Sequence, residues 1–173
     1  MAKFQFAELV DLADVKTVRL GAGTGAGNNL TDAEVGKFVK LVAESRYDLC
    51  AQGNEIEGRI AAVEVATLDG YTVGSVQQGS KFMNVTFDGL QATPGTGTLA
   101  VGDYVVCGTI VAKGTAQGNV PAKVCKATPL SFATTPAVNF PAGSNLSFKW
   151  RVASLGSAGT GAVGTTGVIE YID

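Results

Sequence analysis

The sequence predicts a mainly β protein: a β-sandwich or β-barrel-like domain with one α-helix in its N-terminal half and an extended N-terminal arm. Segments rich in Val, Thr, Tyr and Phe recur after position 58, roughly every 8–12 residues, with turn-forming residues between them. Glycine accounts for 23 of the 173 residues, as expected of short strands joined by tight turns. A single stretch, about 32–46, has helical periodicity.

Residues 1–29 are predicted to form an N-terminal arm and a glycine-rich linker, and residues 30–173 a single β-rich domain. Within the first part, VKTVRL at 15–20 is the best strand candidate. The helix over about 32–46 is predicted from a capping box, in which Thr31 caps the first turn and Glu34 reaches back to it. Four apolar residues then follow at helical spacing: Val35, Phe38, Val39 and Val42.

The rest of the chain is predicted to be β. Asp69-Gly70 is a strong hairpin signal between RIAAVEVATL and YTVGSVQ. In KFMNVTFDG the alternation places Met83, Val85 and Phe87 on one face. In LSFKWRVASL, Trp150 lies on the apolar face. The last strand expected is GVIEYI.

The composition excludes several classes of function. The chain has 13 basic and 15 acidic residues, a net charge of −2, and no histidine. The charge argues against a nucleic-acid partner. The lack of histidine removes Ser-His-Asp and Cys-His catalysis and histidine metal sites. We therefore expect a protein that is not an enzyme and that needs no cofactor and no metal.

The cysteine spacing, the N-terminal sequence and the lengths of the apolar runs predict a protein made in a cytoplasm. Cys50, Cys107 and Cys125 form no CxxC pair, so they are expected to be buried thiols in a reducing compartment. The N-terminus has no signal-peptide pattern, and no apolar run of about 18 residues could span a membrane. We expect no membrane partner and synthesis in a cytoplasm.

The stretch GAGTGAG at 21–27 satisfies G-x-G-x-x-A, which in a dinucleotide-binding turn would cradle phosphate. Here the capping box starts the helix at Thr31, too far beyond the glycines. The peptide AGTGA also recurs at 158–162. We interpret the stretch as a flexible loop.

The acidic residues offer two further candidates. Asp88 and Asp103 could form the carboxylate pair of a glycosidase, but each adjoins a glycine, so both are expected to be turn formers. Glu55 and Glu57 could be surface charges or one side of a calcium site, although the spacing of a calcium-binding loop is missing.

Aromatic and basic side chains suggest contacts with partners. Trp150 is either core or part of an aromatic platform for sugar. Lys149 and Arg151, on the opposite face of that strand, could pair with acids of a neighbouring subunit; the default alternative is a solvent-exposed face. Phe4 and Phe6 have little local sequence to bury them and are predicted to dock into a partner subunit; the alternative is the core of a first strand.

Three segments carry a resemblance to a known family: DGYTVG at 69–74, LAVGDYVV at 99–106 and the glycine-rich GSAGTGAVGTTGVIEYI at 156–172. With the Gly/Thr/Ala/Val-rich region 59–173, they resemble a capsid decoration (cement) protein of tailed bacteriophages. The resemblance implies a structural virion protein on the capsid surface that binds and stabilises the assembled capsid. Its partners would be the major capsid protein and itself, as a dimer or trimer, after assembly in the host cytoplasm.

Two alternatives stay open. Tail-tube, head-completion and baseplate subunits are also virion components, and tail-tube subunits combine β-sheets with one helix and long loops. Ring formation by the isolated protein would favour this group. The second alternative is a carbohydrate-binding module or a minor hydrolase, which requires an exposed aromatic strip that includes Trp150.

Overall fold

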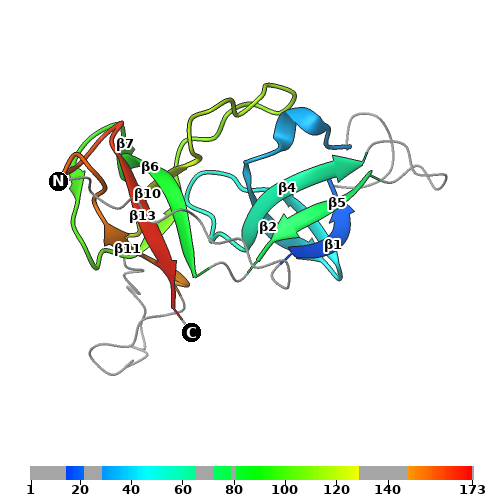
Figure 1. Ribbon diagram of the computed structural model, residues 1–173, viewed down its shortest axis with the longest axis horizontal. Helices are drawn as coiled ribbons and strands as arrows, with labels where there is room; N and C mark the ends of the chain where they lie inside the picture. Colours follow the sequence, from blue (N-terminus) through cyan, green and yellow to red (C-terminus); the bar gives the residue numbers. More distant parts are fainter. Residues whose placement is uncertain (1–14, 22–28, 65–71, 79–80, 129–147, 173) are drawn as a thin grey trace, which may run out of the picture.

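The structure is a computed structural model that describes residues 15–21, 29–64, 72–78, 81–128 and 148–172. Over these residues the chain is mainly β, as the sequence predicts. The strands are β1 (Val15–Leu20), β2 (Phe38–Ala43), β3 (Arg46–Leu49), β4 (Gly58–Glu64), β5 (Thr72–Gln77), β6 (Phe82–Leu90), β7 (Thr93–Pro94), β8 (Thr98–Leu99), β9 (Val105–Cys107), β10 (Lys123–Lys126), β11 (Trp150–Ser154), β12 (Gly161–Ala162) and β13 (Thr166–Tyr171). They form two groups that lie side by side (Figure 1).

The first group, here called the barrel half, comprises β1 to β5. Its strands close into a barrel in the order β1-β3-β2-β4-β5, with β1 also paired to β5. The β1–β3 pair is parallel and the other pairs are antiparallel. Inward-facing side chains fill the barrel with one apolar cluster: Val18, Leu20, Leu30, Val39, Tyr47, Ile60 and Val76. Strand β1 confirms VKTVRL as a strand; residues 1–14 of the predicted arm lie outside the described residues.

The second group, here called the sheet half, comprises β6 to β13. Its main sheet has the order β11-β13-β6-β10-β9, with β7 attached to β6 and with β8 and β12 as a separate pair. The outer strands of this sheet approach each other through a bridge between Tyr104 and Arg151. The Val152 amide donates to the Asp103 carbonyl oxygen at 2.8 Å, and the Gly102 amide donates to the Val152 carbonyl oxygen at 2.8 Å. The sheet therefore curls toward closure around its own core.

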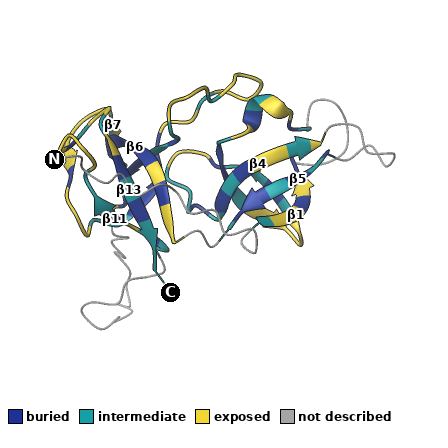
Figure 2. Cartoon of the chain, viewed as in Figure 1, coloured by how far each residue is buried: buried dark blue, intermediate teal, exposed yellow. Residues whose placement is uncertain are grey.

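Several predicted strand faces are confirmed. Met83, Val85 and Phe87 on β6 are fully buried, and Trp150 on β11 is also buried. Strands β4 and β5 pair antiparallel, with Glu64 opposite Val73, as the hairpin signal requires. Its Asp69-Gly70 turn lies outside the described residues. Figure 2 shows the burial gathered between the strands of each half and the exposure on the outer surfaces.

The predicted α-helix over 32–46 is wrong. The capping box is present: the Thr31 hydroxyl accepts from the Ala33 amide at 3.3 Å, and Glu34 Oε2 accepts from the Thr31 amide at 2.6 Å. It begins only a three-residue 3-10 helix, η2 (Asp32–Glu34). Beyond it the chain forms β2 and β3, antiparallel strands that meet at a turn in which Ser45 has φ 52°.

Two physical reasons explain the error. Gly36 has φ +87°, a left-handed conformation that ends a helical turn, and its amide donates to the Ile60 carbonyl oxygen on β4 at 2.8 Å. Successive residues of β2 then face two different cores, so that adjacent Phe38 and Val39 are both buried. Two adjacent buried residues in a strand therefore gave the apolar spacing expected of a helix. The other two residues of that predicted helical pattern, Val35 and Val42, are exposed.

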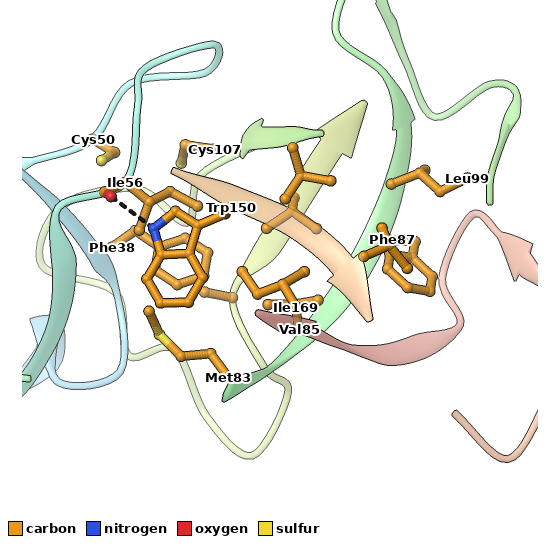
Figure 3. Packing of buried hydrophobic residues seen from close by; sticks show 14 residues of the cluster. Phe38, Cys50, Ile56, Met83, Val85, Phe87, Leu99, Cys107, Trp150 and Ile169 are labelled. Carbon is orange, nitrogen blue, oxygen red and sulfur yellow. Dashed lines mark hydrogen bonds between the residues drawn. The ribbon is translucent and has the colours of Figure 1, made fainter. Parts of the chain in front are cut away.

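One of the apolar clusters contains side chains from both halves. Phe38, Cys50 and Ile56 come from the barrel half, yet they pack in the apolar cluster of the sheet half, which includes Met83 and Trp150. The indole Nε1 of Trp150 donates to the Ile56 carbonyl oxygen at 2.9 Å (Figure 3). Among the described residues, no helix is long and apolar enough to cross a membrane.

Substitution of Gly74 on β5 tests the packing of the barrel. A Cβ at this position would lie 2.4 Å from the Ala62 carbonyl oxygen and 2.4 Å from Leu20 Cδ1. We expect Gly74→Ala to lower the free energy of unfolding by about 3 kcal/mol, because backbone and core must shift to admit the methyl group. Urea denaturation measures the loss. The neighbouring Ser75→Ala is the control and should change stability by less than about 0.5 kcal/mol; equal effects would contradict the close approach.

Candidate functional site

The thiols are buried in the resting protein and are not poised as catalytic nucleophiles. All three cysteines are free and buried, which confirms the expectation that they behave as small apolar residues. A hydrogen bond with the Cys107 thiol, together with burial, raises the pKa of Cys50. Burial raises the pKa of Cys125 to about 12. Because the thiolate is the nucleophile, neither group is activated for catalysis at neutral pH.

The two aspartates considered for glycosidase chemistry have structural partners. Asp103 forms the expected turn, since its Oδ2 accepts from the Ala100 amide at 2.8 Å, and it also pairs with Lys126. Asp88 was expected to bond its own local backbone, and this is wrong. It is buried on β6, where its carboxylate accepts from the Thr109 amide at 2.7 Å and lies 3.5 Å from Lys123 Nζ. Its role is to hold the chain beyond β9 against β6.

A second polar cluster lies where the two halves meet. Lys149 Nζ donates to Glu57 Oε1 at 2.7 Å, and the Lys149 amide donates to Glu55 Oε1 at 3.2 Å. Burial acts to lower the pKa of Lys149, but the hydrogen bond and charge of Glu57 outweigh it and raise the pKa. Burial raises the pKa of Glu55. Within the described ranges, no group of three or more acidic or cysteine side chains is placed to hold a metal ion.

The third polar cluster binds the segment 108–122, which runs from the sheet half to η2 (Figure 1). Glu34 on η2 is fully buried, lies 3.6 Å from Lys37 Nζ and accepts a hydrogen bond from the Gly114 amide. Lys37 Nζ in turn donates to the Ala112 carbonyl oxygen at 2.9 Å. Burial acts to raise the pKa of Glu34, but hydrogen bonds from Gly114 and Thr31 and the charge of Lys37 hold it below 4.5.

An open apolar groove of about 420 Å³ lies on the outer face of the sheet half. Strand register places Phe82 on β6 opposite Glu170 on β13, and Glu170 opposite Arg151 on β11. Phe82 is 43% exposed, and Val101, which also lines the groove, is 61% exposed. Arg151 Nε donates to Glu170 within the groove. The groove is therefore lined mainly by apolar residues and contains one ion pair.

The residues predicted to contact a partner lie in different places. Phe4 and Phe6 lie outside the described residues. Lys149 pairs with Glu57, and Arg151 pairs with Glu170, so both basic groups have partners within their own chain. Of the two described basic residues, Arg151 lines the groove and Lys149 does not.

Sequence reasoning missed Phe82 and Val101. A signal for Phe82 was present, because it is an apolar residue on the opposite face of β6 from Met83, Val85 and Phe87. Val101 lies in the turn before Asp103, where the turn residues gave no indication of a surface. The candidate phosphate loop has its residues 22–28 outside the described residues.

Trp150 is core, as one of the two interpretations holds. Its side chain is 2% exposed and packs edge-on against Tyr171, with ring centroids 5.2 Å apart. It is therefore not available to stack on a sugar ring.

Comparisons with protein-family models, curated proteins and solved structures find no match to this chain.

Substitution of Glu34 tests the fastening of the segment 108–122. We expect Glu34→Gln to lower the free energy of unfolding at pH 7 by about 2–3 kcal/mol, because buried Lys37 loses its counter-charge. A carboxylate with a lowered pKa stabilises the fold above pH 4.5, and this contribution is lost as the pH falls through the folded-state pKa.

The stability difference between wild type and Glu34→Gln should therefore shrink between pH 7 and acid pH, as measured by urea denaturation at each pH. The exposed Glu64→Gln on β4 is the matched control, with little effect at either pH. A difference that stayed constant with pH would contradict the electrostatic role of Glu34.

The tryptophan fluorescence tests the shared core, because the chain has one tryptophan. We expect blue-shifted emission from Trp150 and weak quenching by acrylamide, and no change when oligosaccharides are added. Trp150→Phe should lower stability by about 1–3 kcal/mol, since it leaves the buried Ile56 carbonyl oxygen without its donor. Emission typical of a hydrated indole would show that the two halves separate in solution.

Proposed function

We propose that this chain is a structural component of a tailed-bacteriophage virion, a capsid decoration protein that binds and stabilises the assembled capsid. The observation that carries the proposal is the apolar groove with exposed Phe82 and Val101. It lies on a β fold in which the candidate acids, Asp88 and Asp103, and the thiols already have internal partners. The sequence resemblance supplies the kind of partner.

The physical demands of this role fit these features. A decoration protein needs contact area and repetition rather than a reactive centre, because many copies bind one closed lattice. Binding to the assembled shell, and not to separate subunits, stabilises the shell by mass action. The partners proposed are the major capsid protein and further copies of this chain, as a dimer or trimer at symmetric positions. The location proposed is the outer surface of the capsid.

The test is cosedimentation of the purified protein with capsids of its source virus that lack it, followed by thermal melting of both samples. We expect saturable binding and a higher capsid melting temperature. Absence of binding at micromolar protein would contradict the proposal. Assembly of the isolated protein into rings or tubes would instead support a tail-tube or related subunit.

The groove can be tested in the same assay. We expect the double variant Phe82→Asp, Val101→Asp to weaken capsid binding at least about tenfold, because a few apolar side chains buried in an interface can carry much of its affinity. Val120→Asp, at an equally exposed position outside the groove, is the control and should bind as wild type. Circular dichroism should show both variants folded. Equal binding by both would place the contact surface elsewhere.

A further inference from the structure

Cys50 and Cys107 meet at the junction of the two halves. Cys50 follows β3 in the barrel half, and Cys107 ends β9 in the sheet half. Their backbones are held together, since the Gly53 amide donates to the Cys107 carbonyl oxygen at 2.8 Å and the Cys107 amide donates to the Asn54 carbonyl oxygen at 2.9 Å. Both side chains belong to one apolar cluster and line one cavity of about 20 Å³ (Figure 3). Each thiol donates a hydrogen bond to a nearby backbone carbonyl oxygen, Cys50 to Glu55 at 3.5 Å and Cys107 to Gly108 at 3.6 Å, and both residues line this cavity.

Cys125 is close in space but differently placed. It lies on β10, directly opposite Val106 on β9. Successive residues of a strand face opposite sides of the sheet, so Cys125 shares the face of Val106 and not that of Cys107. Accordingly, Cys125 packs in a separate cluster with Val106 and Ala127. Cys50 is thus the thiol positioned to react with Cys107, and Cys125 serves as an internal control.

We propose that Cys50 and Cys107 are an oxidation site, at which a peroxide converts the two thiols into an intrachain disulfide that joins the barrel half to the sheet half. One sulfur attacks a peroxide oxygen, the O–O bond breaks, and a sulfenic acid and one water form. The second sulfur then attacks the sulfenic sulfur, the S–S bond forms, the S–O bond breaks, and a second water leaves. Two thiols and one hydrogen peroxide give one disulfide and two waters. This inference is independent of the function proposed above.

The fold determines how fast this site reacts. The cavity is large enough for about one water molecule, so a peroxide has little room while the junction is closed. Ile110, Val111 and Gln117 of the segment 108–122 line it. That segment is fastened by Glu34 and Lys37. Oxidation is therefore slow in the resting protein and faster when the segment loosens.

The experiment uses the full chain, hydrogen peroxide as the oxidant, and mass spectrometry of the intact and protease-digested protein without reductant. We expect loss of two hydrogen atoms, a linked peptide pair containing Cys50 and Cys107, and free Cys125. Reductant should reverse the change. The oxidised protein should melt at a higher temperature than the reduced one, because the bond restricts the unfolded chain. Glu34→Gln should form the same bond several-fold faster.

The wild-type peptide map identifies the pair without any variant, which guards against a cysteine substitution that fails to fold. Where they fold, Cys50→Ser and Cys107→Ser should each abolish the linked peptide, and Cys125→Ser should retain it. A linked peptide that contains Cys125, a link between two chains, or sulfinic acid without any link would overturn the proposal. The proposal would also be overturned if all three thiols stayed free at a peroxide concentration that fully oxidises glutathione.

Discussion

The indole of Trp150 and the apolar cluster around it hold the two halves of this protein together. The ring belongs to a strand of the sheet half, but its N–H is satisfied by the carbonyl of Ile56, which the barrel half supplies. Phe38 and Cys50 reach the same cluster from the barrel half. Because a buried N–H without an acceptor is costly, the hydrogen bond fixes the position of one half on the other. The core of the sheet half is therefore completed by side chains of the barrel half.

Polar contacts surround this shared core and depend on it. Lys149 can reach Glu57, and Glu34 can reach Gly114, only while the halves are docked. These contacts join charges and amides that would otherwise be buried without partners. The groove beside Phe82 lies away from these contacts, on the surface of the sheet half. The exposed apolar side chains beside the groove are the observation on which the proposed binding role rests.

Local sequence patterns predicted strands well and misjudged one element. The alternation in β6 and β11 was readable because apolar residues recur at every second position, such as Met83, Val85 and Phe87 in β6 and Trp150 and Val152 in β11. The capping box at Thr31 was also real, but a cap specifies only how a helical turn begins. The turn ended at Gly36 because tertiary pairing with β4 captured its amide. In β2, two cores on opposite sides produced a burial pattern with the spacing of a helix.

The sequence by itself determined the β class, most strand positions, the expected burial of the thiols and the lack of histidine. Tertiary structure decided which strands close into a barrel, that Arg151 pairs with Glu170, that Cys50 meets Cys107, and that Phe82 borders a groove. The reason is the separation in sequence between the residues that make each contact. Side-chain alternation fixes which face of a strand is apolar, whereas these contacts join residues far apart in the chain. Their pairing is set by which cores can be filled together, and that depends on all the strands at once.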